Sequence, residues 1–211
     1  MELGEKELGF YGGFMNRLTI SLALMLCILC LGCKTISTSV IDVALDISSR
    51  DIKTVAVMRF DDKIIQDKAV NGFFIKTMSN PDAGEILADL MVSELSGWDK
   101  FEILSRSEVK GKIRSGGDVE SELVRQRDYK ALGKILKVDA VVIGKIHAFD
   151  LSSMPVYERG VVSFTAECID TQNGKVLWSL EANETAPYKD EIEVASKVIR
   201  EVVERLKKET E

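Results

Sequence analysis

The residues of this 211-residue chain that could do chemistry are few, and three cysteines in one apolar run stand out among them. The run reads LMLCILCLGCKT and contains Cys27, Cys30 and Cys33. Thiolates at such short spacing can hold a metal ion or form a disulfide. The same thiols can also belong to a segment that is cut away during export. The residues around the cysteines distinguish these alternatives.

The segment around the cysteines has the organisation of a secretory signal peptide. Met15–Arg17 is polar with one positive charge, and Leu18–Gly32 is almost entirely apolar. As a helix the apolar part would reach about 22 Å, which is short of the ~30 Å hydrocarbon core of a bilayer. A charged start, a short apolar core and a small residue, Gly32, before the cut are typical of a cleaved signal and not of a membrane span.

The residues Leu31-Gly32-Cys33 resemble the last positions of the lipobox in bacterial lipoprotein precursors. In that class the cysteine after the cut is acylated and becomes the mature N-terminus. The resemblance implies signal cleavage after Gly32 and a covalent lipid at Cys33. No other cofactor is expected. Attached lipid chains of this kind anchor a protein on a membrane. Cys27 and Cys30 would leave with the signal, so they would be neither ligands nor a disulfide. A plain cleaved signal or an uncleaved anchor is the alternative.

The first fourteen residues, MELGEKELGFYGGF, do not fit the start of an export signal, because their charge is predominantly negative. We therefore expect translation to begin at Met15. Residues 1–32 are then leader and signal peptide, residues 33–51 a tether, and residues 52–211 one folded domain. The tether is rich in Ser and Thr and contains one apolar patch that can form a short edge strand.

No catalytic or metal-binding constellation is found in the rest of the sequence. His147 is the only histidine, and no acid or nucleophile accompanies it at motif spacing. Asp61–Asp62 follow a strand without a partner carboxylate or histidine nearby in sequence, which indicates a solvated strand end. Gly116–Gly117 lack the spacing and the following Lys-Ser/Thr of a phosphate-binding loop. Cys168 is predicted to be a buried, inert thiol in a strand. The sequence therefore predicts a protein that is not an enzyme and has no metal site.

Bulk composition excludes some partners. The net charge is −6 and the pI about 5.1. Nucleic-acid phosphates require a basic face, so nucleic acid is not expected as a partner. With 45% hydrophobic residues, 29% charged residues and 3 prolines, the mature chain has the composition of an ordinary folded domain.

Hydrophobic periodicity and turn residues predict an α/β (α+β) domain with a mixed sheet of about four to five strands flanked by helices. Between the first strand and the first helix lies a long loop, Asp61–Ser79, that contains Phe73 and Phe74. This loop either folds over the core as a lid or offers the two phenylalanines to a partner. The predicted elements in order are a strand at Val55–Phe60, a helix from Asn80 to Gly97, a strand at Phe101–Leu104, a helix opened by a Ser105/Glu108 capping box, a helix at Tyr129–Lys137, a strand at Val138–Phe149, a hairpin, and an amphipathic helix at Asp190–Lys208.

The hairpin FTAECIDTQNGKVLWSLEA is the best-specified local feature. A two-residue Asn173-Gly174 turn would place apolar side chains opposite polar ones. A three-residue Gln172-Asn173-Gly174 loop with a left-handed Gly174 makes one face apolar and the other polar, as a half-buried pair requires. We therefore predict the longer loop. Its register pairs Cys168 with Trp178, Ala166 with Leu180, Phe164 with Ala182, Glu167 with Ser179 and Thr165 with Glu181.

Five phrases in order resemble the CsgG/HfaB family of periplasm-facing bacterial lipoproteins, which includes the curli secretion channel subunit. They are KTVAVMRFDD, GEILADLMVSEL, FEILSRSEV, ALGKILKVDAVVIGKI and IDTQNGKVLWS, and the resemblance covers roughly Ile52–Glu181. It implies a mixed sheet flanked by helices and a role in the cell envelope without catalysis. Lys34, where inner-membrane lipoproteins commonly have Asp, favours the periplasmic face of the outer membrane by the same kind of resemblance, with the inner membrane as the alternative.

The channel subunit of that family inserts two long hairpins into the membrane, and this chain has no room for them. Phe149–Gly160 and Ala182–Asp190 are too short for two spanning strands of about 9–11 residues each. The chain is more similar to the tethered relatives that activate penicillin-binding proteins or serve flagella. We therefore expect a docking or regulatory component of an envelope assembly, with Phe73 and Phe74 as candidate partner-binding residues. The alternatives are a homo-oligomeric secretion or transport component, or an enzyme whose site the sequence does not reveal.

Overall fold

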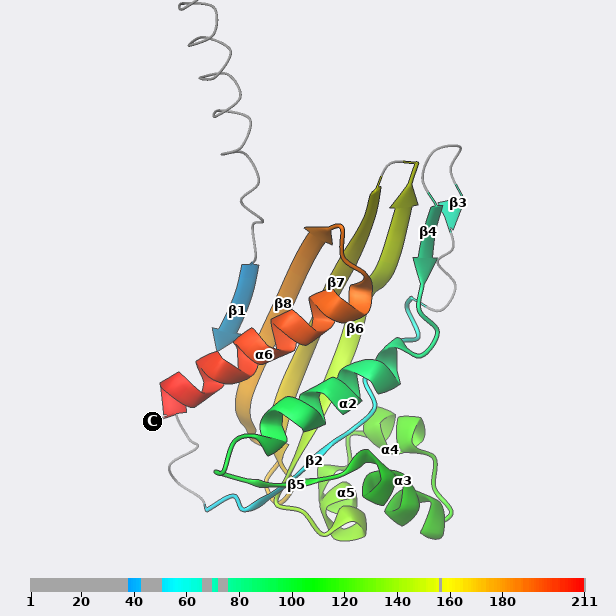
Figure 1. Cartoon of the computed structure of the whole chain (residues 1–211). Helices are drawn as coiled ribbons and strands as arrows, with labels where there is room; N and C mark the ends of the chain where they lie inside the picture. The colour runs from blue at the N-terminus through cyan, green and yellow to red at the C-terminus, as the bar shows by residue number, and fades with distance from the viewer. Residues whose placement is uncertain (1–37, 43–50, 66–69, 72–75, 156, 211) are drawn as a thin grey trace, which may run out of the picture. The chain divides into compact units, whose positions relative to one another are not determined.

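The computed structural model describes residues 38–42, 51–65, 70–71, 76–155 and 157–210 (Figure 1). These residues form a mixed α/β domain around one open sheet, in which six strands follow the order β1-β8-β7-β6-β2-β5 and β4 adds to β6 with β3 at its side. The strands are β1 (Thr38–Asp42), β2 (Thr54–Val57), β3 (Val70–Asn71), β4 (Lys76–Ser79), β5 (Glu102–Leu104), β6 (Ala140–Met154), β7 (Tyr157–Asp170) and β8 (Val176–Pro187). The helices are α2 (Ala83–Ser96), α3 (Arg106–Ser115), α4 (Glu120–Gln126), α5 (Tyr129–Leu136) and α6 (Glu191–Thr210).

The sheet has a parallel half and an antiparallel half. β2 pairs in parallel with both β5 and β6. Parallel neighbours need crossover connections, and the chain supplies α2 before β5 and the α3–α5 segment before β6. β6, β7 and β8 follow one another as antiparallel neighbours, and β1 adds to the outer edge of β8. The edge strand expected within the tether is therefore present.

Helices cover both faces of the sheet at β2. Val55 and Val57 face a core that includes buried residues of α2 and α6, whereas Ala56 and Met58 face a second core with buried residues of α3 and α5. This arrangement explains the continuous apolar run in β2, because a strand covered on both faces has no polar side. Figure 1 shows α2 and α6 side by side over one face of the sheet.

The predicted hairpin register is confirmed in every pair. Cys168 pairs with Trp178, Ala166 with Leu180 and Phe164 with Ala182, and the polar pairs Glu167–Ser179 and Thr165–Glu181 lie on the other face. Gly174 has φ +72°, the left-handed conformation that the bulged loop requires.

The helix boundaries lie within two residues of the predicted ones at most ends and differ most at the start of α2. The capping box of Ser105 and Glu108 is present at the start of α3. The predicted cap of α2 at Asn80 is wrong, because the helix begins at Ala83. The Asn80 side chain instead accepts a hydrogen bond from the backbone N–H of Asp82 at 3.0 Å. The carboxylate of Asp62 accepts from the backbone N–H of Gly84 at 3.3 Å, so a distant residue caps this helix.

Three elements were missed by the sequence interpretation. The long loop at 61–79 contains β3 and β4, and β4 pairs antiparallel with the second half of β6, from Asp150 to Ser153. Helix α4 was not predicted. Both β4 and α4 are short and largely polar, so their periodicity is weak and tertiary contacts decide them. Phe73 and Phe74 lie outside the described residues, and the choice between lid and partner-binding surface stays open.

Candidate functional site

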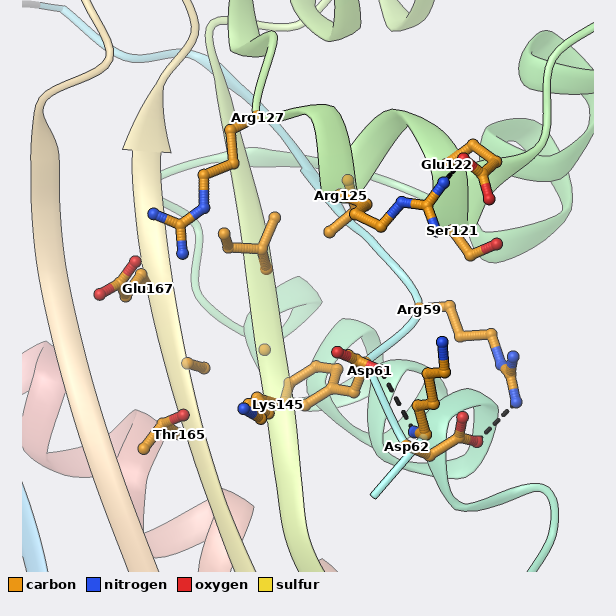
Figure 2. A pocket seen from close by; sticks show the side chains of 16 residues that line it. Arg59, Asp61, Asp62, Ser121, Glu122, Arg125, Arg127, Lys145, Thr165 and Glu167 are labelled. Carbon is orange, nitrogen blue, oxygen red and sulfur yellow. Dashed lines mark hydrogen bonds and ion pairs between the residues drawn. The ribbon is translucent and has the colours of Figure 1, made fainter. Parts of the chain in front are cut away.

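A hollow of about 680 Å³ lies between the end of β2, helix α4 and the middle of β6 and β7 (Figure 2). Its volume falls within the range of small-molecule sites. Charged side chains of both signs surround it. The cations are Arg59, Lys63, Arg125, Arg127 and Lys145, and the anions are Asp61, Asp62, Glu122 and Glu167.

Ion pairs neutralise part of this charge. Arg59 binds Asp62 at 2.6 Å, and Arg125 binds Glu122. Within the part of the chain that the structure describes, Lys63, Arg127 and Lys145 take part in no ion pair. Together with Asp61 and Glu167 they leave an open, mixed-charge lining with one excess positive charge. Such a lining can hold a polar or zwitterionic partner surface.

Arg106 anchors the helix that forms one wall of the hollow. Its guanidinium is 6% exposed and donates hydrogen bonds to the Val57 carbonyl at 2.8 Å, to Glu120 Oε1 at 2.8 Å and to Glu85 Oε2 at 3.0 Å. Glu120 is the first residue of α4 and also accepts from the backbone N–H of Arg59 at 2.6 Å. This cluster ties α4 to β2, α2 and α3.

The electrostatics of the cluster are those of a paired charge network. Burial tends to raise the pKa of Glu85, but the hydrogen bonds and charges of Arg106 and Lys110 outweigh it and hold that pKa below its usual value. Burial likewise opposes the charge of Arg106, and its hydrogen bonds to Glu120 and Glu85 outweigh this, so that its pKa is raised. Arg106 therefore remains a cation and serves to position α4.

The two aspartates after β2 have different roles, and the prediction of a solvated strand end is wrong for one of them. Asp61 is exposed and its backbone extends the pairing with β6, since its N–H donates to the Gly144 carbonyl at 2.8 Å. Asp62 is 4% exposed, pairs with Arg59 and caps α2 at Gly84. A Cβ on Gly84 would lie 2.4 Å from the Phe60 carbonyl oxygen, so this contact requires glycine.

The structure does not bring the sequence-predicted site residues together. Gly32 and Cys33 at the predicted cleavage site, and Phe73 and Phe74, lie outside the described residues. His147 is exposed on β6. Among the described residues no group of three or more His, Cys, Asp or Glu side chains is arranged to hold a metal ion.

Cys168 is buried at 3% exposure against Trp178, as predicted. Burial, and to a lesser degree the charge of Asp170, raises the pKa of its thiol, so the reactive thiolate is disfavoured.

Sequence reasoning missed Arg106 and α4 entirely. Arg106 carries no local signal, because its burial arises from contacts with three separate elements.

None of the helices in the described part of the chain combines the length and the apolar character that a membrane span needs. The fold places α2 and α6 on one face of the mixed sheet and α3–α5 on the other. The family model described as curli production assembly/transport component CsgG matches residues 38–202. This chain belongs to the CsgG family, and family membership indicates a component of the cell envelope.

Two solved structures have a similar fold. The PelC dodecamer from Paraburkholderia phytofirmans matches with a TM-score of 0.52 and 18% identity, covering 80% of this chain and 95% of that chain. Lipoprotein GNA1162 from Neisseria meningitidis matches with a TM-score of 0.53 and 16% identity, covering 74% of this chain and 99% of that chain. No curated protein sequence matches this chain. At these identities the likeness shows a shared fold.

Proposed function

We propose that this protein is a lipoprotein anchored through Cys33 to the periplasmic face of the outer membrane, where it acts as a non-catalytic docking or regulatory component of an envelope assembly. The observation that carries the docking role is the mixed-charge hollow beside α4. The family match and a lipoprotein of the same fold support the envelope setting.

The hollow suits a protein partner for two physical reasons. Its cations Lys63, Arg127 and Lys145 are without ion pairs within the described residues, so a partner carboxylate can engage them without breaking an existing pair. The wall that carries Arg127 is held by buried Arg106, so little conformational entropy is lost when a partner binds. Phe73 and Phe74, on the segment between β3 and β4, are a second proposed contact.

Charge reversal tests the hollow. Arg127→Glu combined with Lys145→Glu should reduce co-purification of the partner from detergent-extracted membranes, because it replaces two cations of the lining by anions. The matched control is Lys130→Glu with Lys134→Glu, two exposed cations of α5 that do not line the hollow. Equal capture by both double variants, with unchanged melting temperatures, would exclude the hollow as the docking site.

The two phenylalanines are tested separately. Phe73→Ala with Phe74→Ala should preserve the fold and reduce partner capture if these side chains bind a partner. If the double variant unfolds at ordinary temperature, the aromatic rings belong to the core and the lid alternative is correct.

A second candidate function is an oligomeric secretion or transport component. The observations that favour it are the family description, which names transport, and the dodecameric state of PelC. Native mass spectrometry of the detergent-extracted protein separates the two functions. A closed ring of many subunits would support transport, whereas a monomer or dimer would support the docking module.

A further inference from the structure

The floor of the hollow carries both signs of charge on one face of the sheet. Lys145 of β6 pairs with Thr165 of β7, and Ile143 pairs with Glu167, so Lys145 and Glu167 are diagonal neighbours on adjacent strands. The Cβ atoms of such diagonal neighbours lie within about 7–8 Å of each other. Among the residues that the structure describes, Lys145 and Glu167 nevertheless form no ion pair. Both charges are therefore available to a bound molecule.

The residue that ends α4 has an unusual backbone conformation. Arg127 follows the last helical residue, Gln126, and has φ +54° and ψ 25°, which is the left-handed region. Its N–H donates to the Val124 carbonyl at 3.2 Å and closes the end of the helix. Glycine is the common residue in this conformation at a helix end, because it has no Cβ to clash with the following carbonyl oxygen. Glycine at this position would therefore relieve the backbone of α4.

The end of α5 provides an internal comparison. Lys137 is also left-handed, with φ +57°, and its N–H donates to the Gly133 carbonyl. Lys137 is exposed but does not line the hollow, whereas Arg127 is exposed and lines it. Figure 2 shows the side chain of Arg127 extending from the end of α4 toward β6 and β7. The two residues share a backbone conformation and differ in their relation to the hollow.

The charges of the lining that have no ion pair within the described ranges are three cations and two anions. They are Lys63, Arg127 and Lys145, and Asp61 and Glu167. A purely acidic ligand would bring its carboxylates close to the two anions, and a purely basic ligand would meet the three cations. Like charges in contact are unfavourable, so a ligand that carries both signs fits this lining best.

The number and position of these charges favour a chain over a small molecule. The five side chains come from the end of β2, the end of α4, β6 and β7, and all five are exposed. A free amino acid carries one carboxylate and one ammonium group, which leaves most of the five without a partner. A peptide segment can present several charged side chains along its length.

From this arrangement we infer that the hollow binds a mixed-charge peptide segment, in which acidic side chains contact Arg127 and Lys145 and a basic side chain contacts Glu167. The inference rests on the docking role proposed above and names the chemistry of the segment that docks. Arg127 determines the specificity for a carboxylate, because a guanidinium binds it through two parallel hydrogen bonds. Glycine would suit the backbone at position 127 but would lose this contact.

A peptide array tests the charge requirement. The full-length protein, extracted in detergent and fluorescently labelled, is applied to hexapeptides composed of Glu, Lys and Ala in all orders. We expect binding to be concentrated on peptides that contain both Glu and Lys, and to be weak for peptides of Glu alone, Lys alone or Ala alone. The Kd of the best peptide is then measured in solution by fluorescence anisotropy. The affinity should fall as salt is added, because the contacts are exposed ion pairs.

Two glycine variants separate binding from stability. Arg127→Gly and Lys137→Gly should each leave the urea midpoint unchanged or raise it, because glycine adopts the left-handed conformation without strain. Arg127→Gly should weaken binding of the best mixed-charge peptide by about tenfold or more, whereas Lys137→Gly should bind it like wild type. Arg127→Asn should weaken binding similarly, since asparagine also tolerates this conformation and carries no charge.

Three results would overturn the inference: tightest binding by peptides of Glu alone or Lys alone, equal binding by all charge classes or by none, and unchanged affinity of both Arg127 variants. None of these results decides the docking role itself. That role is measured separately, by capture of the natural partner with Arg127→Glu and Lys145→Glu against the Lys130→Glu and Lys134→Glu control. If partner capture is lost while no hexapeptide binds, docking at the hollow is retained and the mixed-charge segment is excluded.

Discussion

Replacing Arg106 by methionine tests whether the buried guanidinium stabilises the wall of the hollow. Arg106→Met keeps an unbranched side chain but removes the donors that bind Val57, Glu85 and Glu120. The side chains of Glu85 and Glu120 are 24% and 14% exposed, so both carboxylates would remain largely buried without their common partner.

The contacts that Glu85 and Glu120 keep determine how much unfolding free energy the Arg106→Met variant loses. Removing one member of a buried ion pair costs about 3–5 kcal/mol. Glu85 would retain Lys110 at 2.5 Å, and Glu120 would retain the backbone N–H of Arg59 at 2.6 Å. We therefore expect a loss near the lower limit, about 3 kcal/mol. With a urea m-value of about 2 kcal/mol/M, the unfolding midpoint falls by about 1.5 M.

Urea unfolding followed by the fluorescence of the two buried tryptophans measures this loss. Arg200→Met is the control, because the Arg200 side chain is 63% exposed and lies 3.6 Å from Glu94, and such surface pairs contribute about 0–1 kcal/mol. An Arg106→Met midpoint equal to wild type, or higher, would refute the reasoning. It would mean that the desolvation of three charged groups offsets their attraction. Adding Glu85→Gln and Glu120→Gln to Arg106→Met should recover part of the lost stability.

Three further outcomes are expected. In the folded, processed protein, a thiol reagent should leave Cys168 unmodified until denaturant is added, because burial excludes the reagent and raises the pKa of the thiol. Rapid modification without denaturant would contradict the buried position of Cys168. Gly133→Ala should lower the free energy of unfolding, measured by thermal unfolding, by about 1–3 kcal/mol, because its Cβ would lie 2.5 Å from the Thr171 side chain. The control is Gly111→Ala, whose Cβ meets nothing within 4 Å and which should not destabilise the protein. Glu85 should make the free energy of unfolding depend on pH in acid, because its pKa in the folded protein is below the usual 4.5. Its contribution to that free energy is complete above about pH 4.5 and disappears as the pH falls through the folded pKa. The dependence should be weaker in Arg106→Met, and an unchanged pH profile would count against the pairing.

Local patterns were sufficient for the elements whose neighbours in space are also neighbours in sequence. The β7–β8 register followed from the alternation of apolar and polar residues around Gly174, because a shift of one residue would move each strand's side chains to the wrong face. The Ser105/Glu108 capping box was likewise visible, since both of its hydrogen bonds close within one turn. The buried strand β2 was visible as an apolar run.

The candidate site could not be derived in this way. The hollow joins residues of β2, α4, β6 and β7, and no spacing in the sequence reports that these elements meet. Asp62 has the sequence context of a solvated residue, yet it caps a helix that begins more than twenty positions later, at Ala83. β4 becomes a strand because the long β6 offers it an edge.

The sequence by itself determined the α/β class and the hairpin register, because each depends on periodicity or chemistry within a few neighbouring residues. The export signal that ends at Cys33 stays a prediction. Only the tertiary structure decided that Arg106 is buried between two glutamates and that α4 borders a charged hollow. Those features depend on the position of one element relative to another, and burial and charge pairing act through space across elements that the sequence separates.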